Sequence, residues 1–151
     1  MTSDGSETTR LLTSPVHLSE NLTHQVYGGK IHIFSLTSLA DAQVDAWIKA
    51  LDDWYGLIEI HGRPAERVAL ILNDFSKLDV NASTYSRTRL RELATTHRDL
   101  RGWSGVAISK ALYAQIPELQ RQWMEGKIEW RYFKSRDDAL TWLMIMNAKK
   151  E

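Results

Sequence analysis

The sequence predicts an α/β domain with a mixed, mostly parallel sheet of about five strands and four helices. From residue 20 onward, the apolar pattern alternates between the two-residue period of strands and the 3.6-residue period of helices. Residues 68–72 form an uninterrupted apolar run, which is typical of a central strand covered on both faces. Two alternating segments flank Gly28 and Gly29, which predicts that the sheet opens with a β-hairpin.

The first half of the domain is expected to be a hairpin followed by a helix. Residues 21–27 and 30–36 have strand character on either side of the glycine pair. Residues 38–55 place apolar side chains at helical spacing, so they form one wide stripe. Ser38 and Asp41 have the spacing of a capping box, which predicts where this helix begins.

The second half repeats the alternation of strands and helices. We expect strands at residues 103–108 and 128–133, and helices at residues 83–98, 109–124 and 135–146. Pro117 interrupts the middle helix because it cannot donate a backbone hydrogen bond. Ser135 and Asp138 have capping-box spacing at the start of the last helix. Helix-length connections imply parallel neighbouring strands, and the alternating hairpin strands place the helices mostly on one face of the sheet.

Length and composition bound the class of protein. The 151 residues suit one domain, which we place at residues 15–151 after a disordered polar tail at residues 1–14. The 19 basic and 19 acidic side chains cancel, so net charge gives no attraction to nucleic acid. The lack of cysteine excludes disulfides, thiolate metal sites and a cysteine nucleophile. No apolar stretch approaches the ~20 residues of a membrane span, so we expect a cytoplasmic protein.

Three segments resemble the STAS domain of bacterial anti-sigma-factor antagonists. Residues 68–76 are similar to the family's central strand, which ends in an Asp, an apolar residue and often a Ser. Residues 81–84 resemble the start of the following helix, and residues 132–143 resemble the closing strand and helix. The likeness spans residues 20–146 and rests on topology and spacing. It implies a non-catalytic regulatory module without a cofactor, whose partner is an anti-sigma factor or a kinase-like regulator.

In that family, a serine at the start of the second helix is phosphorylated by the partner kinase, which switches off binding. The matching residue here is Ser83, although Ala82 replaces the family's Asp and Tyr85 stands where a small residue is usual. A phosphate would add about −1.5 to −2 charges at the positive end of the helix dipole, with Arg87 one turn on. The alternative for Ser83 is a helix N-cap, which is the commonest use of a serine at this position.

The sequence places a partner-binding surface at the end of the buried strand and the start of the next helix. Loops at the carboxyl ends of parallel strands are where such sheets usually bind ligands. The candidate residues are Asp74, Ser76, Asp79, Ser83, Arg87 and Arg91. Arg87 and Arg91 lie one turn apart, so both can grip a phosphate or a carboxylate. The alternative for the charged residues is a solvated face with weak ion pairs.

Enzyme and metal chemistry find less support. The five histidines lack a second ligand at close helical spacing, so no metal site is predicted. Ser83, His97 and Asp99 cannot form a triad, because roughly 20 Å of helix separates the serine from the histidine. No residues combine a nucleophile, a base and an orienting group at suitable spacing, so no catalytic residue is predicted.

The alternative function is a module that binds a lipid or a small apolar ligand. The Ala-x-x-Trp-Leu ending at residues 139–143 favours it, because it resembles an antagonist-like offshoot with a likeness to lipid-transfer folds. Core packing is the default role for the four of the six tryptophans that fall on apolar helical stripes, namely Trp47, Trp54, Trp123 and Trp142. The pairs Trp54–Tyr55 and Trp130–Tyr132 are the candidates for lining a pocket or an interface.

Overall fold

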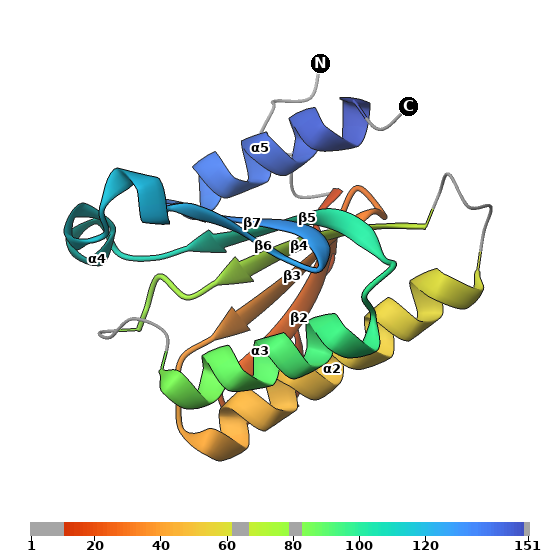
Figure 1. The fold of residues 1–151 in the computed structure, drawn as a ribbon, viewed down its shortest axis with the longest axis horizontal. Coiled ribbons are helices and arrows are strands. Elements are labelled where there is room, and N and C mark those ends of the chain that lie inside the picture. Colours follow the sequence, from red (N-terminus) through yellow and green to blue (C-terminus); the bar gives the residue numbers. More distant parts are fainter. Residues whose placement is uncertain (1–10, 62–66, 79–82, 150–151) are drawn as a thin grey trace.

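A seven-stranded mixed sheet forms the centre of the domain in the computed structural model, which describes residues 11–61, 67–78 and 83–149 (Figure 1). Its elements are β1 (Val16–Ser19), β2 (Leu22–Tyr27), β3 (Ile31–Leu36), α2 (Asp41–Ile60), β4 (Val68–Asp74), α3 (Thr84–Thr96), β5 (Arg101–Ala107), α4 (Lys110–Gln115), the 3-10 helix η2 (Glu118–Gln120), β6 (Gln122–Glu125), β7 (Lys127–Phe133) and α5 (Arg136–Lys149). The strand order is β1-β2-β3-β4-β5-β7-β6. Strands β3, β4, β5 and β7 run parallel, and the remaining pairs are antiparallel. The predicted α/β class, the parallel inner sheet and the opening hairpin are confirmed.

Strand β1 and the residues before it add an edge that the sequence analysis did not predict. β1 pairs antiparallel with β2. Leu12 forms a bridge with Tyr27, and Thr13 N donates to Val26 O at 3.0 Å. Leu12 and Thr13 therefore pair with the sheet, although they fall within the tail expected at residues 1–14, of which residues 1–10 lie outside the described residues.

The helix expected at residues 109–124 is wrong in its second half. Helix α4 ends at Gln115, Pro117 precedes η2, and the chain then forms strand β6 against β7. Gly126 makes the turn between these strands with φ +60°, a conformation that glycine adopts without a steric cost. A strand of four residues is too short for its two-residue period to outweigh a helical pattern.

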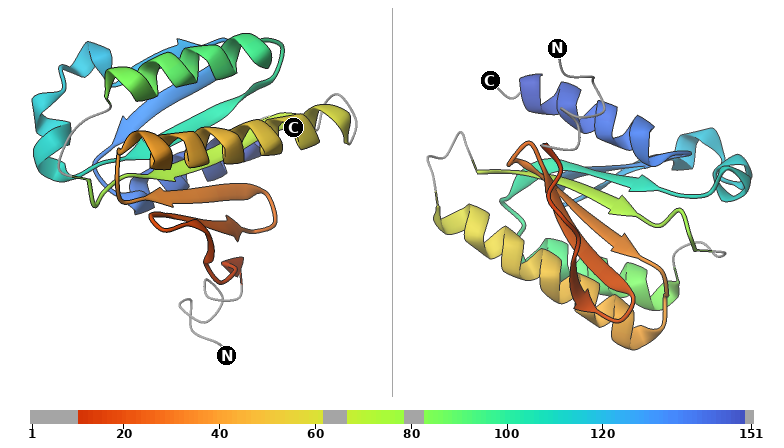
Figure 2. Two further views of the ribbon diagram at one scale, coloured as in Figure 1. Left: turned by 90° about the horizontal axis from the view of Figure 1, so that it is seen from below. Right: turned by 180° about the vertical axis from the view of Figure 1, so that it is seen from behind.

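Helices cover both faces of the sheet, which corrects the expectation that they lie mostly on one face. Figures 1 and 2 show α2 and α3 side by side on one face and α5 on the other. Strand β3 explains the difference, because both of its faces are buried. Ile31 and Ile33 pack in the core beneath α5, whereas Phe34 and Leu36 pack in the core beneath α2 and α3.

Side-chain capping fixes some of the helix starts. Ser38 Oγ accepts from Ala40 N at 3.2 Å, and Ala40 itself caps α2 without a side-chain hydrogen bond, so the predicted box with Asp41 is wrong. Ser135 Oγ accepts from Asp138 N at 3.1 Å, as predicted for the last helix. Each such cap contributes about 1 kcal/mol to a helix.

Candidate functional site

A cavity of about 540 Å³ lies on the face of the sheet that α2 and α3 cover. It opens between α3 and the segment from α4 to β6, with the sheet below. Its lining residues are Trp47, Phe75, Ser86, Arg87, Leu90, Arg91, Val106, Ile108, Gln115, Ile116, Pro117, Leu119, Gln120, Gln122, Trp123, Glu125, Trp130 and Tyr132. This volume falls within the range of about 300–1,000 Å³ that is usual for small-molecule sites.

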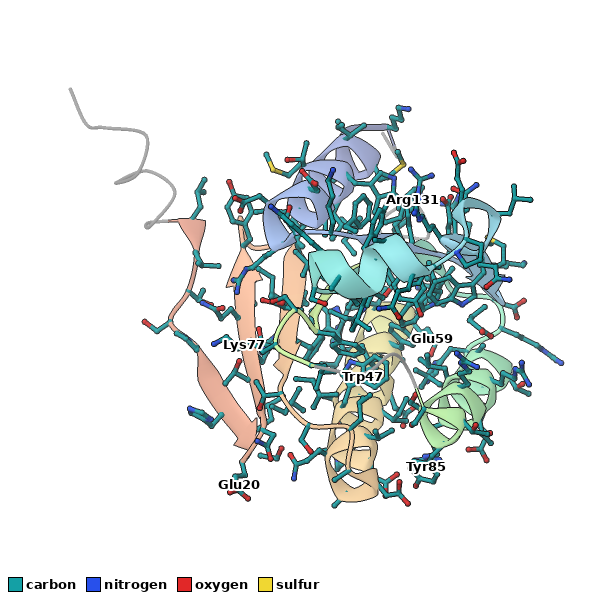
Figure 3. All side chains as sticks on the ribbon, turned by 90° about the vertical axis from the view of Figure 1, so that its left-hand side faces the viewer. Glu20, Trp47, Glu59, Lys77, Tyr85 and Arg131 are labelled. Atoms are coloured by element: carbon teal, nitrogen blue, oxygen red, sulfur yellow. The ribbon has the colours of Figure 1, made fainter. Side chains whose placement is uncertain are left out.

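Aromatic side chains form the floor and one wall of the cavity. Trp47 lies on α2 on the side that faces the sheet (Figure 3). Its ring meets Phe75 and Trp130 edge-on, with centroids 5.1 and 6.4 Å away. Trp123 of β6 stacks on Trp130 at 5.8 Å and lies 4.9 Å from the Tyr132 ring. These contacts give the cavity a broad, fixed apolar surface, which suits a ligand with an aromatic or aliphatic body.

Asn73, which is fully buried at the end of β4, holds this floor in place. Its Oδ1 accepts from Trp47 Nε1 at 3.0 Å. Its Nδ2 donates to Ser104 Oγ at 2.8 Å and to Gly105 O at 3.2 Å. These bonds satisfy a buried amide and fix the orientation of Trp47. The sequence analysis placed the buried strand at the apolar run of residues 68–72 and missed the role of Asn73, because a polar residue after such a run usually marks the end of a strand.

Two arginines of α3 stand at the mouth of the cavity. Arg87 and Arg91 both line it, and both are exposed to solvent. Within the described part of the chain, neither guanidinium lies within 4.0 Å of a carboxylate. Arg89, between them in sequence, instead contacts Asp45 at 3.3 Å and Glu92 at 3.1 Å. Arg87 and Arg91 therefore line the same cavity, in agreement with their helical spacing. The cavity itself was not predicted from the sequence.

Glu125 of β6 also lines the cavity, close enough to Arg91 for their charges to interact. Burial raises the pKa of this carboxyl, while the charge of Arg91 and a hydrogen bond from Trp123 act to lower it. Glu125 therefore places one acceptor beside Arg91. Among the described residues that line the cavity, it is the only carboxylate, and none is a histidine, lysine or aspartate.

The strand-end residues predicted for the same surface form a separate cluster. Asp74 Oδ1 accepts from Ser76 N at 3.1 Å and from Ser76 Oγ at 2.6 Å. Its Oδ2 lies 3.4 Å from Arg136 Nη1, and Arg136 Nη2 donates to Gln25 Oε1 at 3.0 Å. The cluster ties the end of β4 to the start of α5. Asp74 and Ser76 are not among the residues that line the cavity.

Ser83 is the N-cap of α3, so this interpretation of the residue is confirmed. Its Oγ accepts from Ser86 N at 3.1 Å, and its backbone O accepts from Arg87 N at 3.1 Å. The side chain is partly exposed at the end of the helix. Phosphorylation of Ser83 stays a prediction. Asp79, which belongs to the same predicted surface, lies outside the described residues.

His97, at the end of α3, holds two carboxylates of α2. Its Nδ1 lies 2.6 Å from Glu59 Oε1, and its Nε2 lies 2.6 Å from Asp52 Oδ1. Burial lowers the pKa of His97, but the hydrogen bonds and charges of the two carboxylates outweigh this and raise the pKa above its usual value. Three or more ligating side chains arranged to hold a metal ion do not occur in the described ranges.

Of the two aromatic pairs considered for a pocket, one lines the cavity. Trp130 and Tyr132 belong to it, whereas Tyr55 is buried in the core and Trp54 packs on His32 with ring centroids 3.6 Å apart. Trp123 completes the wall and was expected in a helix. The lining comes from several elements that are distant in sequence, so no local pattern could reveal it.

Comparison of the chain with protein-family models, with curated proteins and with solved structures finds no match. The resemblance to the STAS family therefore stays a prediction. In the described ranges, the helices lack the combination of length and apolar character that crossing a membrane requires.

Proposed function

We propose that this protein is a non-catalytic module that binds a small molecule with an apolar body in the cavity beside α3. The observation that supports the proposal is the aromatic-floored cavity of about 540 Å³. Covering such a surface gains roughly 25 cal/mol for each Å² of apolar area removed from water. The hydrogen bonds of Asn73 hold the floor before a ligand arrives, which lowers the entropic cost of binding.

The lining residues favour binding over catalysis. A general acid–base reaction needs a titratable group within hydrogen-bond reach of the reacting atom. Glu125 is the one carboxylate among the described lining residues, and no hydroxyl nucleophile there is paired with a histidine. Ser86 Oγ, which also lines the cavity, instead donates to the backbone O of Ser83 at 2.8 Å.

Titration with decanol, an uncharged apolar probe, tests the proposal. Binding is measured by calorimetry and by the fluorescence of the tryptophans in the cavity. We expect Trp123→Ala to weaken binding at least tenfold, because it removes one wall. Trp103→Ala is the matched control, since Trp103 is half-buried against the core beneath α5 and does not line the cavity. Absence of binding to the wild-type chain, or equal losses in both variants, would contradict the proposal.

A second candidate is the role implied by the STAS resemblance, a cytoplasmic regulatory module that binds an anti-sigma factor or a kinase-like regulator. The position of Ser83 supports it. The residue is partly exposed at the start of a 13-residue helix, with Arg87 in the next turn. A phosphate there would be favoured by the helix dipole and would change the charge that a partner meets.

This second candidate is tested by affinity capture from the native lysate with mass-spectrometric identification. Ser83→Asp keeps a capping oxygen and adds a charge, so the fold should tolerate it. Ser109→Asp is the matched control, because Ser109 caps α4 in the same way by accepting from Leu112 N at 3.2 Å. A regulator or kinase lost only with Ser83→Asp would support the proposal. The same proteins captured by all three chains would argue against it.

A further inference from the structure

Two positively charged side chains, Arg87 and Arg91, stand at the mouth of the cavity and indicate the chemical class of its ligand. We propose that the ligand is an amphipathic anion, whose apolar body lies on the aromatic floor and whose carboxylate or phosphate is held by Arg87 and Arg91. This inference rests on the proposed small-molecule function and extends it. It names the chemistry at the polar end of the ligand, where the cavity meets solvent.

The first argument is that two cations share one cavity without a counter-ion at contact distance. Arg87 and Arg91 are four residues apart, and like charges at this helical spacing repel each other. Four other arginines in the described ranges contact carboxylates or carbonyl oxygens: Arg89, Arg121, Arg131 and Arg136. An anion between Arg87 and Arg91 would relieve their repulsion and accept several charge-assisted hydrogen bonds.

The second argument is the balance of charged groups along the cavity wall. The described lining residues include two guanidinium groups and one carboxylate, Glu125. A guanidinium can only donate hydrogen bonds, so the mouth is best suited to a ligand that carries acceptor atoms. The indole Nε1 of Trp130, which lacks a partner among the described residues, takes no part, because that atom is covered by protein.

The groups that face the two arginines differ. Tyr132 lies toward Arg87, and burial raises the pKa of this phenol while the charge of Arg87 opposes the rise. Glu125 faces Arg91 and would repel an anion there. We therefore expect Arg87 to contribute more to anion binding than Arg91. The variant Glu125→Gln should bind the anion more tightly than the wild type.

The experiment compares decanoate, decyl phosphate, decanol and inorganic phosphate by calorimetry on the full chain at pH 7.5. We expect the wild type to bind the better of the two anionic amphipaths about tenfold more tightly than decanol, since an ion pair at an exposed mouth is partly screened. The double variant Arg87→Gln/Arg91→Gln should lose this preference, so that it binds the anionic amphipaths no more tightly than it binds decanol. Arg98→Gln is the control, because Arg98 is exposed just after the end of α3 but does not line the cavity.

Each outcome supports or overturns a stated part of the proposal. Equal affinity of the wild type for decanol and for both anions would overturn the proposal that the ligand is an anion. The proposal that the cavity binds a small apolar molecule would remain supported. Failure of decanol and both amphipaths to bind would overturn both proposals. If inorganic phosphate binds as tightly as decyl phosphate, the proposal that the ligand has an apolar body is overturned. The arginines would then bind a free anion. Tighter binding of decyl phosphate than of decanoate would identify the head group as a phosphate.

Discussion

At the scale of single residues, His97 makes stability depend on pH. Its two ring nitrogens both contact carboxylates, so the protonated form is favoured in the folded chain and its pKa is raised. A group whose pKa is higher in the folded state than in the unfolded state contributes its full stabilisation when the pH is below the unfolded pKa. For histidine the unfolded pKa is about 6.5. That contribution is lost as the pH rises through the folded pKa. We expect the free energy of unfolding to fall by about 1 kcal/mol from pH 6.5 to 9, because the carboxylates are partly exposed.

Urea unfolding at several pH values measures this effect, with His97→Gln as the comparison. The variant should be less stable at pH 6.5 and should lack the decline above it. His32 acts in the opposite direction, because burial and the charge of His24 lower its pKa to about 4. Its contribution is lost only as the pH falls from about 6.5 to 4. A decline above pH 6.5 that persists in His97→Gln would contradict the assignment.

At the scale of elements, the close approach of β4 and β5 depends on one glycine. Gly102 pairs with Ala69, and a Cβ at this position would overlap the backbone O and N of Ala69. We expect Gly102→Ala to lower the free energy of unfolding by about 3 kcal/mol, because the backbone of a central strand cannot move aside. Gly56→Ala is the control within α2, where nothing lies within 4 Å of the added methyl group. That change should stabilise the chain by about 0.5–1 kcal/mol.

Chemical denaturation of both variants checks this prediction, since the two substitutions add the same methyl group. Equal effects in the two variants would show that the contact between Gly102 and Ala69 does not limit the spacing of these strands.

The elements also show what the sequence could predict. The apolar run at residues 68–72 and the glycine pair at 28–29 identified β4 and the hairpin, because their signals are local and strong. Strand β6 was missed because four residues carry too little periodicity. The position of α5 was missed because the alternating pattern of residues 30–36 was interpreted as a strand with one solvent-exposed face. Ile31 and Ile33 are instead buried beneath α5.

The candidate site was predicted only in part for a related reason. Arg87 and Arg91 could be paired from helical spacing alone, which is a local relation. The cavity behind them is assembled from α2, α3, β6 and β7, so it depends on tertiary packing. Asp74 and Ser76 were placed with the arginines because the topology brings strand ends and helix starts together. Their side chains instead form the cluster with Arg136, a contact that sequence order does not reveal.

At the scale of the whole molecule, two apolar cores share one sheet. One core lies beneath α2 and α3 and carries the cavity, and the other lies beneath α5. Leu51 and Leu143 are both fully buried, one in each core. Strands β3 and β4 contribute side chains to both cores, so loss of packing on one face should weaken the other. The floor of the cavity thus depends on a helix on the opposite side of the sheet.

This coupling predicts that Leu51→Ala and Leu143→Ala lower the stability of one cooperative unit. Each substitution should cost about 2–5 kcal/mol, the usual range for a buried leucine. Unfolding followed by far-UV circular dichroism and by tryptophan fluorescence should give coincident transitions in both variants, because single domains of this size usually unfold in one step. Two separated transitions in Leu143→Ala would show that α5 and its core unfold independently. The ligand site could then persist without them, and binding of decanol to this variant after the first transition would demonstrate it.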